Sequence, residues 1–281
     1  MNKTTGYTYH LLLLICIFIA GAIKSYGQSL SEWTEKGYFY MELDSLAQAE
    51  ECFNQAIKAD AANKHNALLL ANLGTVQRLR GKMREALESY TQALGYAPLN
   101  TAILMGRATA YMTLGNDDKA YTDLCNVLDK EPTNTEALYY RAFIYTDRRE
   151  YSAARADYKR LLAIAPDHEN ALLGLALLDQ REGRLQNAEL QLTMLIESHP
   201  DKPIYLQARA NVLMERELFD LALIDLEEAI ALQSTDAHLY VARAELYLKM
   251  KRRAAAKGDL DRAVALGLPR IALNELYKQC E

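Results

Sequence analysis

Residues 101–134 read TAILMGRATAYMTLGNDDKAYTDLCNVLDKEPTN, and residues 135–168 read TEALYYRAFIYTDRREYSAARADYKRLLAIAPDH. The two stretches are equal in length and place alanine, aspartate and proline at matching positions. The same spacing of 34 residues continues along the chain, with alanine at Ala86, Ala120, Ala154, Ala188, Ala222 and Ala256 and proline at Pro98, Pro132, Pro166 and Pro200. A fixed period of this length indicates a repeat protein, so the number of stacked units replaces a count of globular domains.

Each unit has the hydrophobic spacing of two amphipathic helices. In the fourth unit Leu138, Ala142 and Tyr145 lie at i, i+4 and i+7, and the same spacing resumes from Ala154 to Leu162. The chain is therefore predicted to be all-α. Counting from the alanines gives seven units at 30–63, 67–100, 101–134, 135–168, 169–202, 203–236 and 237–268, and the first step alone is longer, at 37 residues.

The turn inside each unit has one position where glycine is frequent. Three units carry glycine there and four carry another residue, in chain order Asp44, Gly81, Gly115, Arg149, Gly183, Glu217 and Lys251. A residue just past a helix C-terminus often adopts the left-handed conformation that glycine tolerates, so we expect that conformation at this position. The turns between units combine proline with a nearby Asn or Asp, which suits the end of one helix and the start of the next.

The residue pattern of the units resembles the tetratricopeptide repeat family. The resemblance covers about residues 30–268 and is carried in the first unit by Trp33, Gly37, Tyr40, Ala49, Phe53 and Ala56. The small position of each helix is Gly or Ala in all seven units, which lets the two helices approach closely. The resemblance implies a right-handed superhelical solenoid of seven helix-turn-helix units. Residues 269–281 are predicted to form a capping helix, and Gln77 and Asp179, where the family usually has Tyr, are interpreted as tolerated variation.

A charged pair recurs in four of the seven units. The first helix carries arginine and the second carries aspartate 16 residues later in Arg107 and Asp123, Arg141 and Asp157, Arg209 and Asp225, and Arg243 and Asp259. The other three units lack both residues. This co-occurrence favours a structural salt bridge inside each unit over a row of charges that would bind a ligand.

In proteins similar to this family, a second stripe of the first helices, one residue beyond the core stripe, lines a concave groove, and this stripe is the candidate partner-binding groove. It contains Met105, Met112, Tyr139, Phe143, Leu173, Leu177, Asn211 and Met214. An apolar stripe on such a surface marks a site for a protein or peptide partner, such as an extended segment or an amphipathic helix. The alternatives are packing against the adjacent unit and burial in a homodimer. Family members that bind chaperones hold a terminal carboxylate with basic residues on this face. The position that would supply the lysine carries Ala71, Met105, Tyr139 and Leu173 here, so this carboxylate clamp is absent.

The sequence contains no constellation typical of catalysis. The histidines after residue 27 are spread over the turns between units, where capping of helices or contact with solvent is the expected role. Cys52 and Cys125 are expected to be small buried residues, and no zinc or disulfide spacing is present. We therefore predict a protein that is not an enzyme and that has no cofactor and no metal site.

Residues 1–27 have the order of a secretory signal peptide. Lys3 precedes an apolar run from Leu11 to Ile23, which Lys24 and a small-residue segment follow. The run is shorter than a membrane-spanning helix requires, so cleavage is favoured over an uncleaved anchor. Without this segment 30 basic residues face 37 acidic ones, which argues against nucleic-acid binding. The prediction is an exported scaffold, periplasmic or secreted, without membrane insertion after cleavage; the alternatives are a membrane-tethered chain and a self-associating subunit of an envelope complex.

Overall fold

The structure, a computed structural model, describes residues 30–59 and 66–281. These residues form helices and turns, with no strand among them. The predicted signal peptide, residues 1–27, lies outside the described residues. The helices pair as α2 (Leu30–Glu42) with α3 (Leu46–Ala59), α4 (Asn66–Leu79) with α5 (Met83–Tyr96), α6 (Thr101–Thr113) with α7 (Asp117–Lys130), α8 (Thr135–Asp147) with α9 (Tyr151–Ile164), α10 (Glu169–Arg181) with α11 (Leu185–Ser198), α12 (Pro203–Glu215) with α13 (Phe219–Leu232), and α14 (Ala237–Lys249) with α15 (Arg253–Ala265).

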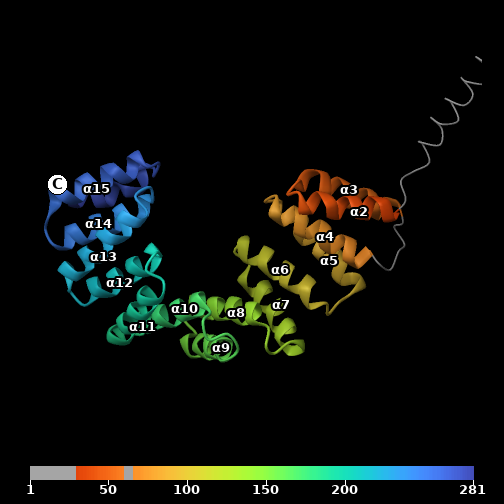
Figure 1. The fold of residues 1–281 in the computed structure, drawn as a ribbon, viewed down its shortest axis with the longest axis horizontal. Helices are drawn as coiled ribbons and strands as arrows, with labels where there is room; N and C mark the ends of the chain where they lie inside the picture. The colour runs from red at the N-terminus through yellow and green to blue at the C-terminus, as the bar shows by residue number, and fades with distance from the viewer. Residues whose placement is uncertain (1–29, 60–65) are drawn as a thin grey trace, which may run out of the picture. The chain divides into compact units, whose positions relative to one another are not determined.

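The chain divides into two units, one ending at Lys130 and the other beginning at Glu131 (Figure 1). In the N-terminal unit each helix packs on the next one in sequence, and the first helices α4 and α6 also touch. In the C-terminal unit α8, α10, α12 and α14 follow one another as neighbours, and each second helix packs on the first helix of the next pair. The prediction of an all-α architecture made of repeated helix pairs is confirmed.

The small residues lie where the two helices of a pair cross. Every alanine at these positions is fully buried, for example Ala142 and Ala154 in the fourth pair. At Gly74 an added Cβ would approach the Tyr90 ring to 3.0 Å, which is tighter than ordinary van der Waals contact. Large aromatic or leucine side chains of the second helix thus fill the space that the small residues leave. The glycine and alanine residues at the crossings therefore set how closely the two helices of each pair approach.

All seven turns inside the pairs contain a residue with positive φ at the predicted position. Gly81, Gly115 and Gly183 have φ between 69° and 76°, and the four other residues there have φ between 53° and 61°. Some of the expected helix caps are also present, because the Asn100 and Asn134 side chains accept hydrogen bonds from Ile103 N and Ala137 N. The seven turns thus share one backbone conformation although four lack glycine, at a cost of about 1–2 kcal/mol at each non-glycine residue.

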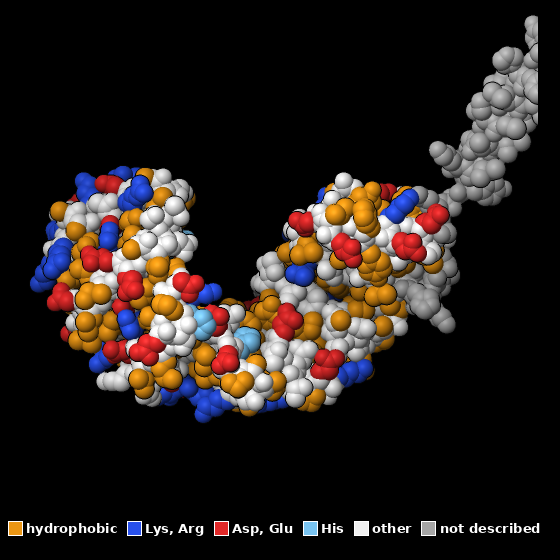
Figure 2. All heavy atoms as spheres, in the orientation of Figure 1, with side chains coloured by type: hydrophobic (Ala, Val, Ile, Leu, Met, Phe, Trp, Pro, Cys, Tyr) orange, Lys and Arg blue, Asp and Glu red, His pale blue; other side chains and the backbone are white. Residues whose placement is uncertain are grey.

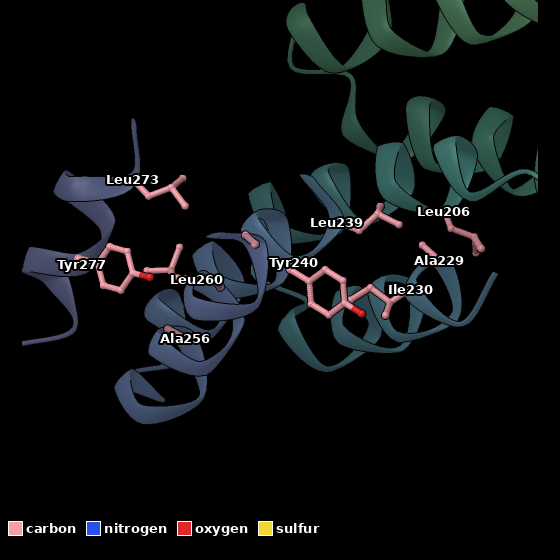
Figure 3. Packing of buried hydrophobic residues seen from close by; sticks show 11 residues of the cluster. Leu206, Ala229, Ile230, Leu239, Tyr240, Ala256, Leu260, Leu273 and Tyr277 are labelled. Carbon is pink, nitrogen blue, oxygen red and sulfur yellow. The ribbon is translucent and has the colours of Figure 1, made fainter. Parts of the chain in front are cut away.

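The C-terminal segment covers the last helix pair with a 3₁₀ turn, Arg270–Leu273, followed by the short helix α16, Asn274–Gln279. Figure 3 shows Leu273 and Tyr277 of this segment pointing toward Leu260 of α15. Both side chains are buried, and the Tyr277 hydroxyl donates to Asp261 Oδ1 at 2.8 Å. Ile271, in the same 3₁₀ turn as Leu273, is 80% exposed.

Successive repeats meet at one recurring pair of positions, which we call the junction pair. One member is the fifth residue of a second helix. The other belongs to the next repeat and lies three residues before the first residue of its second helix. The pair is ionic in Glu50 with Arg80, in Arg155 with Glu182, and in Glu189 with Arg216. At the junction after repeat six the same positions carry Leu223 and Met250, which pack on one apolar cluster. The sign of the charge reverses between junctions, so neighbouring repeats are matched individually.

Candidate functional site

The four predicted arginine–aspartate pairs all form inside their repeats. In the sixth repeat Arg209 donates from Nε to Asp225 Oδ2 at 2.8 Å and from Nη2 to Asp225 Oδ1 at 2.7 Å. The pairs of repeats three, four and seven have the same two-bond geometry, with distances from 2.7 to 2.9 Å. The four carboxylates are between 2% and 7% exposed. The pairs therefore belong to the packed interior and not to a ligand-binding row, as predicted.

Repeats two and five replace this pair by a different polar contact, which the sequence interpretation missed. Gln77 and Asp179, read as tolerated variation, are buried and bonded to the residue that stands at the aspartate position. Ser89 Oγ donates to Gln77 Oε1 at 2.7 Å, and Gln191 Nε2 donates to Asp179 Oδ2 at 2.5 Å. The signal was present in the sequence, because both repeats carry leucine instead of the arginine.

The Asp179 carboxylate lies at the centre of a cluster of arginine side chains. Arg155 of the preceding repeat donates to Asp179 Oδ1 at 2.7 Å, and Arg184 donates to the same oxygen at 2.8 Å. Burial disfavours the ionised carboxyl, but the hydrogen bonds from Arg184 and Gln191 and the charge of Arg155 outweigh burial and hold the pKa of Asp179 below its usual value. Because Asp179 and Glu182 both bind Arg155, this cluster joins repeats four and five.

In the N-terminal unit the candidate groove residues are Met105 and Met112, both on α6. Met105 is 8% exposed, so it presents little surface to a partner, and Met112 is half-buried. The physical reason is the close approach of neighbouring first helices, since α6 touches α4. Packing, one of the two alternatives at this stripe, therefore accounts for Met105.

In the C-terminal unit the stripe is more open on α8 and α10. Phe143 is 50% exposed, while Tyr139, Leu173 and Leu177 are half-buried. Leu173 and Leu177 also pack against the apolar cluster that contains Ala176 and Leu192. Since α8 and α10 are neighbours, and Phe143 and Leu177 hold equivalent positions in them, these side chains form one apolar strip.

On α12 the stripe is polar where it is exposed and apolar where it is buried. Asn211 is exposed, whereas Met214 is 7% exposed and belongs to a buried cluster with Leu226. Gln180 of α10 donates to Glu215 of α12 at 2.6 Å, which adds a polar contact between these two first helices. The accessible apolar part of the candidate groove in this unit is thus centred on Phe143, with a polar continuation at Asn211. Figure 2 shows that hydrophobic and charged side chains alternate over the face in view of each unit.

The described histidines have structural positions. His168 is the N-cap of α10, where its Nδ1 accepts from Ala171 N at 3.2 Å, and the ring of Tyr139 lies 5.8 Å away. His199 Nε2 lies 3.4 Å from Glu169 Oε1. Cys52 is buried as expected, but Cys125 is only half-buried. Among residues 30–59 and 66–281, no three His, Cys, Asp or Glu side chains are grouped as metal ligands.

A pocket of about 930 Å³ between the second helices α9 and α11, over α10, was not foreseen from the sequence. Its lining includes Arg155, Lys159, Leu172, Leu175 and Met194. Leu172 and Leu175 lie on a different face of α10 from the groove residues Leu173 and Leu177.

None of the described helices combines the length and the hydrophobicity that a membrane crossing needs.

These features define a repeat protein built of helical hairpins. Family models described as tetratricopeptide repeat match residues 33–63, 72–134 and 145–212. A tetratricopeptide repeat protein from Parabacteroides merdae is 33% identical, with a TM-score of 0.80 over 90% of this chain and 99% of that one. The chain belongs to the tetratricopeptide repeat family.

More distant relatives share the repeats within larger proteins. RNA polymerase II-associated protein 3 of Mus musculus is 28% identical over 73% of this chain and 33% of its own length. DnaJ homolog subfamily C member 3 of Gallus gallus is 23% identical over 86% of this chain and 56% of its own length. The chain thus spans between a third and just over half of these relatives. The Cut9–Hcn1 structure, at 14% identity and a TM-score of 0.64, shares the fold.

Proposed function

We propose that this protein is a non-catalytic scaffold of the cell envelope that binds a peptide or an amphipathic helix of a partner protein along its first helices. Proteins of this repeat family mediate contacts between proteins. The observation that carries the proposal is the half-exposed Phe143 ring beside the apolar residues Leu173 and Leu177 on the neighbouring first helix. An aromatic ring left in water is a typical anchor for a partner's apolar side chain.

The electrostatics of this strip suit an apolar segment more than a charged one. Tyr139 contributes an uncharged ring with a polar tip, and burial raises the pKa of its hydroxyl further above the physiological range. The partner would place alternate or i, i+4 apolar side chains against Phe143 and Leu177, and polar groups near Asn211.

The test is affinity purification from the native source followed by mass spectrometry, with wild-type protein, Phe143→Asp and Leu221→Asp. Leu221 is 49% exposed on α13, so its substitution is a matched control on another surface. The proposal expects one partner to be captured by wild type and by Leu221→Asp and to be lost with Phe143→Asp at unchanged helicity. Equal capture by all three proteins would contradict it.

The envelope location rests on the apolar N-terminal segment and is tested separately. Fractionation of the source cells should place the protein outside the cytoplasm, and N-terminal sequencing should find the mature chain beginning at or near Gln28. A full-length chain in the membrane fraction would favour the tethered alternative, and a full-length cytoplasmic chain would refute export. Light scattering of the purified protein distinguishes a monomer with an open strip from a self-associating subunit.

A further inference from the structure

The pocket between α9 and α11 lies where repeat five lacks the arginine that repeats three and six place between two second helices. In repeat six Arg209 lies between two second helices, since it binds Asp225 on α13 and donates from Nη1 to Thr193 on α11 at 3.1 Å. Arg107 does the same in repeat three, with a bond to Thr91 on α5 at 3.4 Å. Repeat five has Leu175 at this position, so no guanidinium of α10 reaches the second helices there; Arg155 of α9 binds Asp179 instead.

A lysine stands at the mouth of the open space. Lys159 occupies in α9 the position of Thr91 in α5 and Thr193 in α11, which accept the hydrogen bonds of Arg107 and Arg209. Its side chain is exposed and forms no ion pair with a described carboxylate. Gln191 takes the place of the aspartate that four other repeats carry there. The aspartate that binds the arginine in four repeats is thus replaced by a neutral side chain, which donates to Asp179.

The other charges around the pocket do not cancel this lysine. Arg155, one turn before Lys159, is bound by Asp179 and Glu182. Asp167 lies at the far end, in the turn that follows α9, and His199 at the end of α11 faces Glu169. Lys159 is therefore a cation of the pocket lining that no described carboxylate pairs, and an anionic group of a ligand would gain a charge-assisted contact with it.

The rest of the lining is apolar and reaches solvent. Leu172, Leu175 and Leu195 form the inner surface, and Met194 at the rim is 60% exposed. One turn earlier on α11, Leu190 is 63% exposed. The position of Met194 carries a polar or charged residue in every other repeat: Gln55, Gln92, Asn126, Arg160, Glu228 and Arg262. The apolar rim is thus specific to the repeat that has the open pocket.

We propose that this pocket is a second binding site, which takes an acidic amphipathic helix of a partner protein. A carboxylate of the helix would bind Lys159 Nζ, and an apolar side chain one turn away would enter the pocket against Leu175 and Met194. Glutamate and leucine at i and i+4 share one face of a helix, which matches a cation beside an apolar cavity. The site lies on second helices, so it is independent of the strip around Phe143.

The experiment measures fluorescence anisotropy of a labelled helical peptide with leucine and glutamate at i and i+4, added to the chain from residue 28 onward. Lys159→Glu should weaken binding at least tenfold. Lys257→Glu, the same charge change at an exposed position of α15, should leave it unchanged. Leu175→Arg, which restores the guanidinium of the other repeats, should also weaken binding. Thermal melting confirms that each variant is folded.

Three results would overturn the proposal: the absence of binding that depends on Lys159, equal affinity for a peptide with lysine in place of glutamate, or equal loss in the two lysine variants. Dodecanoate is included as a competitor. If it binds at Lys159 and the acidic peptide does not, the ligand is an aliphatic carboxylate and the assignment to a protein helix is wrong. Phe143→Asp should not change the peptide affinity, which separates this site from the first-helix strip.

Discussion

Removal of one carboxylate from a buried arginine–aspartate pair should cost much more than removal of the whole pair. Asp225 is 3% exposed and accepts two short hydrogen bonds from Arg209, whose side chain is 22% exposed. Asp225→Ala leaves that guanidinium next to a small cavity with one remaining protein partner, Thr193. Breaking a buried pair in this way costs roughly 3–5 kcal/mol, and the partial exposure of Arg209 lowers our expectation to about 2–3 kcal/mol.

The double variant Arg209→Met with Asp225→Leu replaces both charged side chains by apolar ones of similar volume. It leaves no unpaired charge, so we expect a loss below about 1 kcal/mol. The assay is urea unfolding followed by circular dichroism, with hydrogen exchange of α12 and α13 to locate the effect, because repeat arrays can unfold in parts. Glu245→Ala, an exposed position on α14, is the control. If the single and the double variant lose equal stability, the pair does not act as a coupled unit and the reasoning is refuted.

Three further perturbations test other parts of the structure. Ala154→Trp should destabilise by more than about 2 kcal/mol in chemical unfolding, because the helix crossing has no space for a ring; a loss below 0.5 kcal/mol would contradict this. Arg149→Gly should raise stability by about 0.5–1 kcal/mol, since φ is 61° there and glycine removes that strain at some entropic cost; a lower melting temperature would count against it. The pKa of Asp179 is lowered in the folded state, so its contribution is present above about pH 4 and is lost as the pH falls through the folded pKa. Asp179→Asn should therefore be less stable than wild type at pH 7 and should lose less stability on acidification to pH 3; parallel pH curves would exclude the role.

The repeat architecture follows from the sequence because its determinants are local and recur. Alanine and glycine at the helix crossings, and the residues of the left-handed turns, each specify one contact that the period then multiplies. The arginine–aspartate pair could be predicted for the same reason, because both partners are present together in four repeats and absent together from the other three.

The parts that the sequence interpretation missed depend on exceptions to the period. Gln77 and Asp179 looked like tolerated variation because each was compared with the usual tyrosine and not with the residue across the helix pair. The exposed fraction of each side chain along the candidate strip was also not predicted. Met105 and Phe143 have the same apolar character in sequence, and only the packing of the neighbouring helices makes one buried and the other half exposed.

The junction pairs have a consequence for how a chain like this one can evolve. Repeat arrays lengthen and shorten when whole repeats are copied or lost. Repeat five carries Glu182 at its leading junction and Glu189 at its trailing one, so a tandem copy would set one glutamate against the other. Loss of repeat five would set Arg155 against Arg216. Either event brings like charges together, so selection would resist changes of copy number at this place in the array even though repeats two to six have the same length.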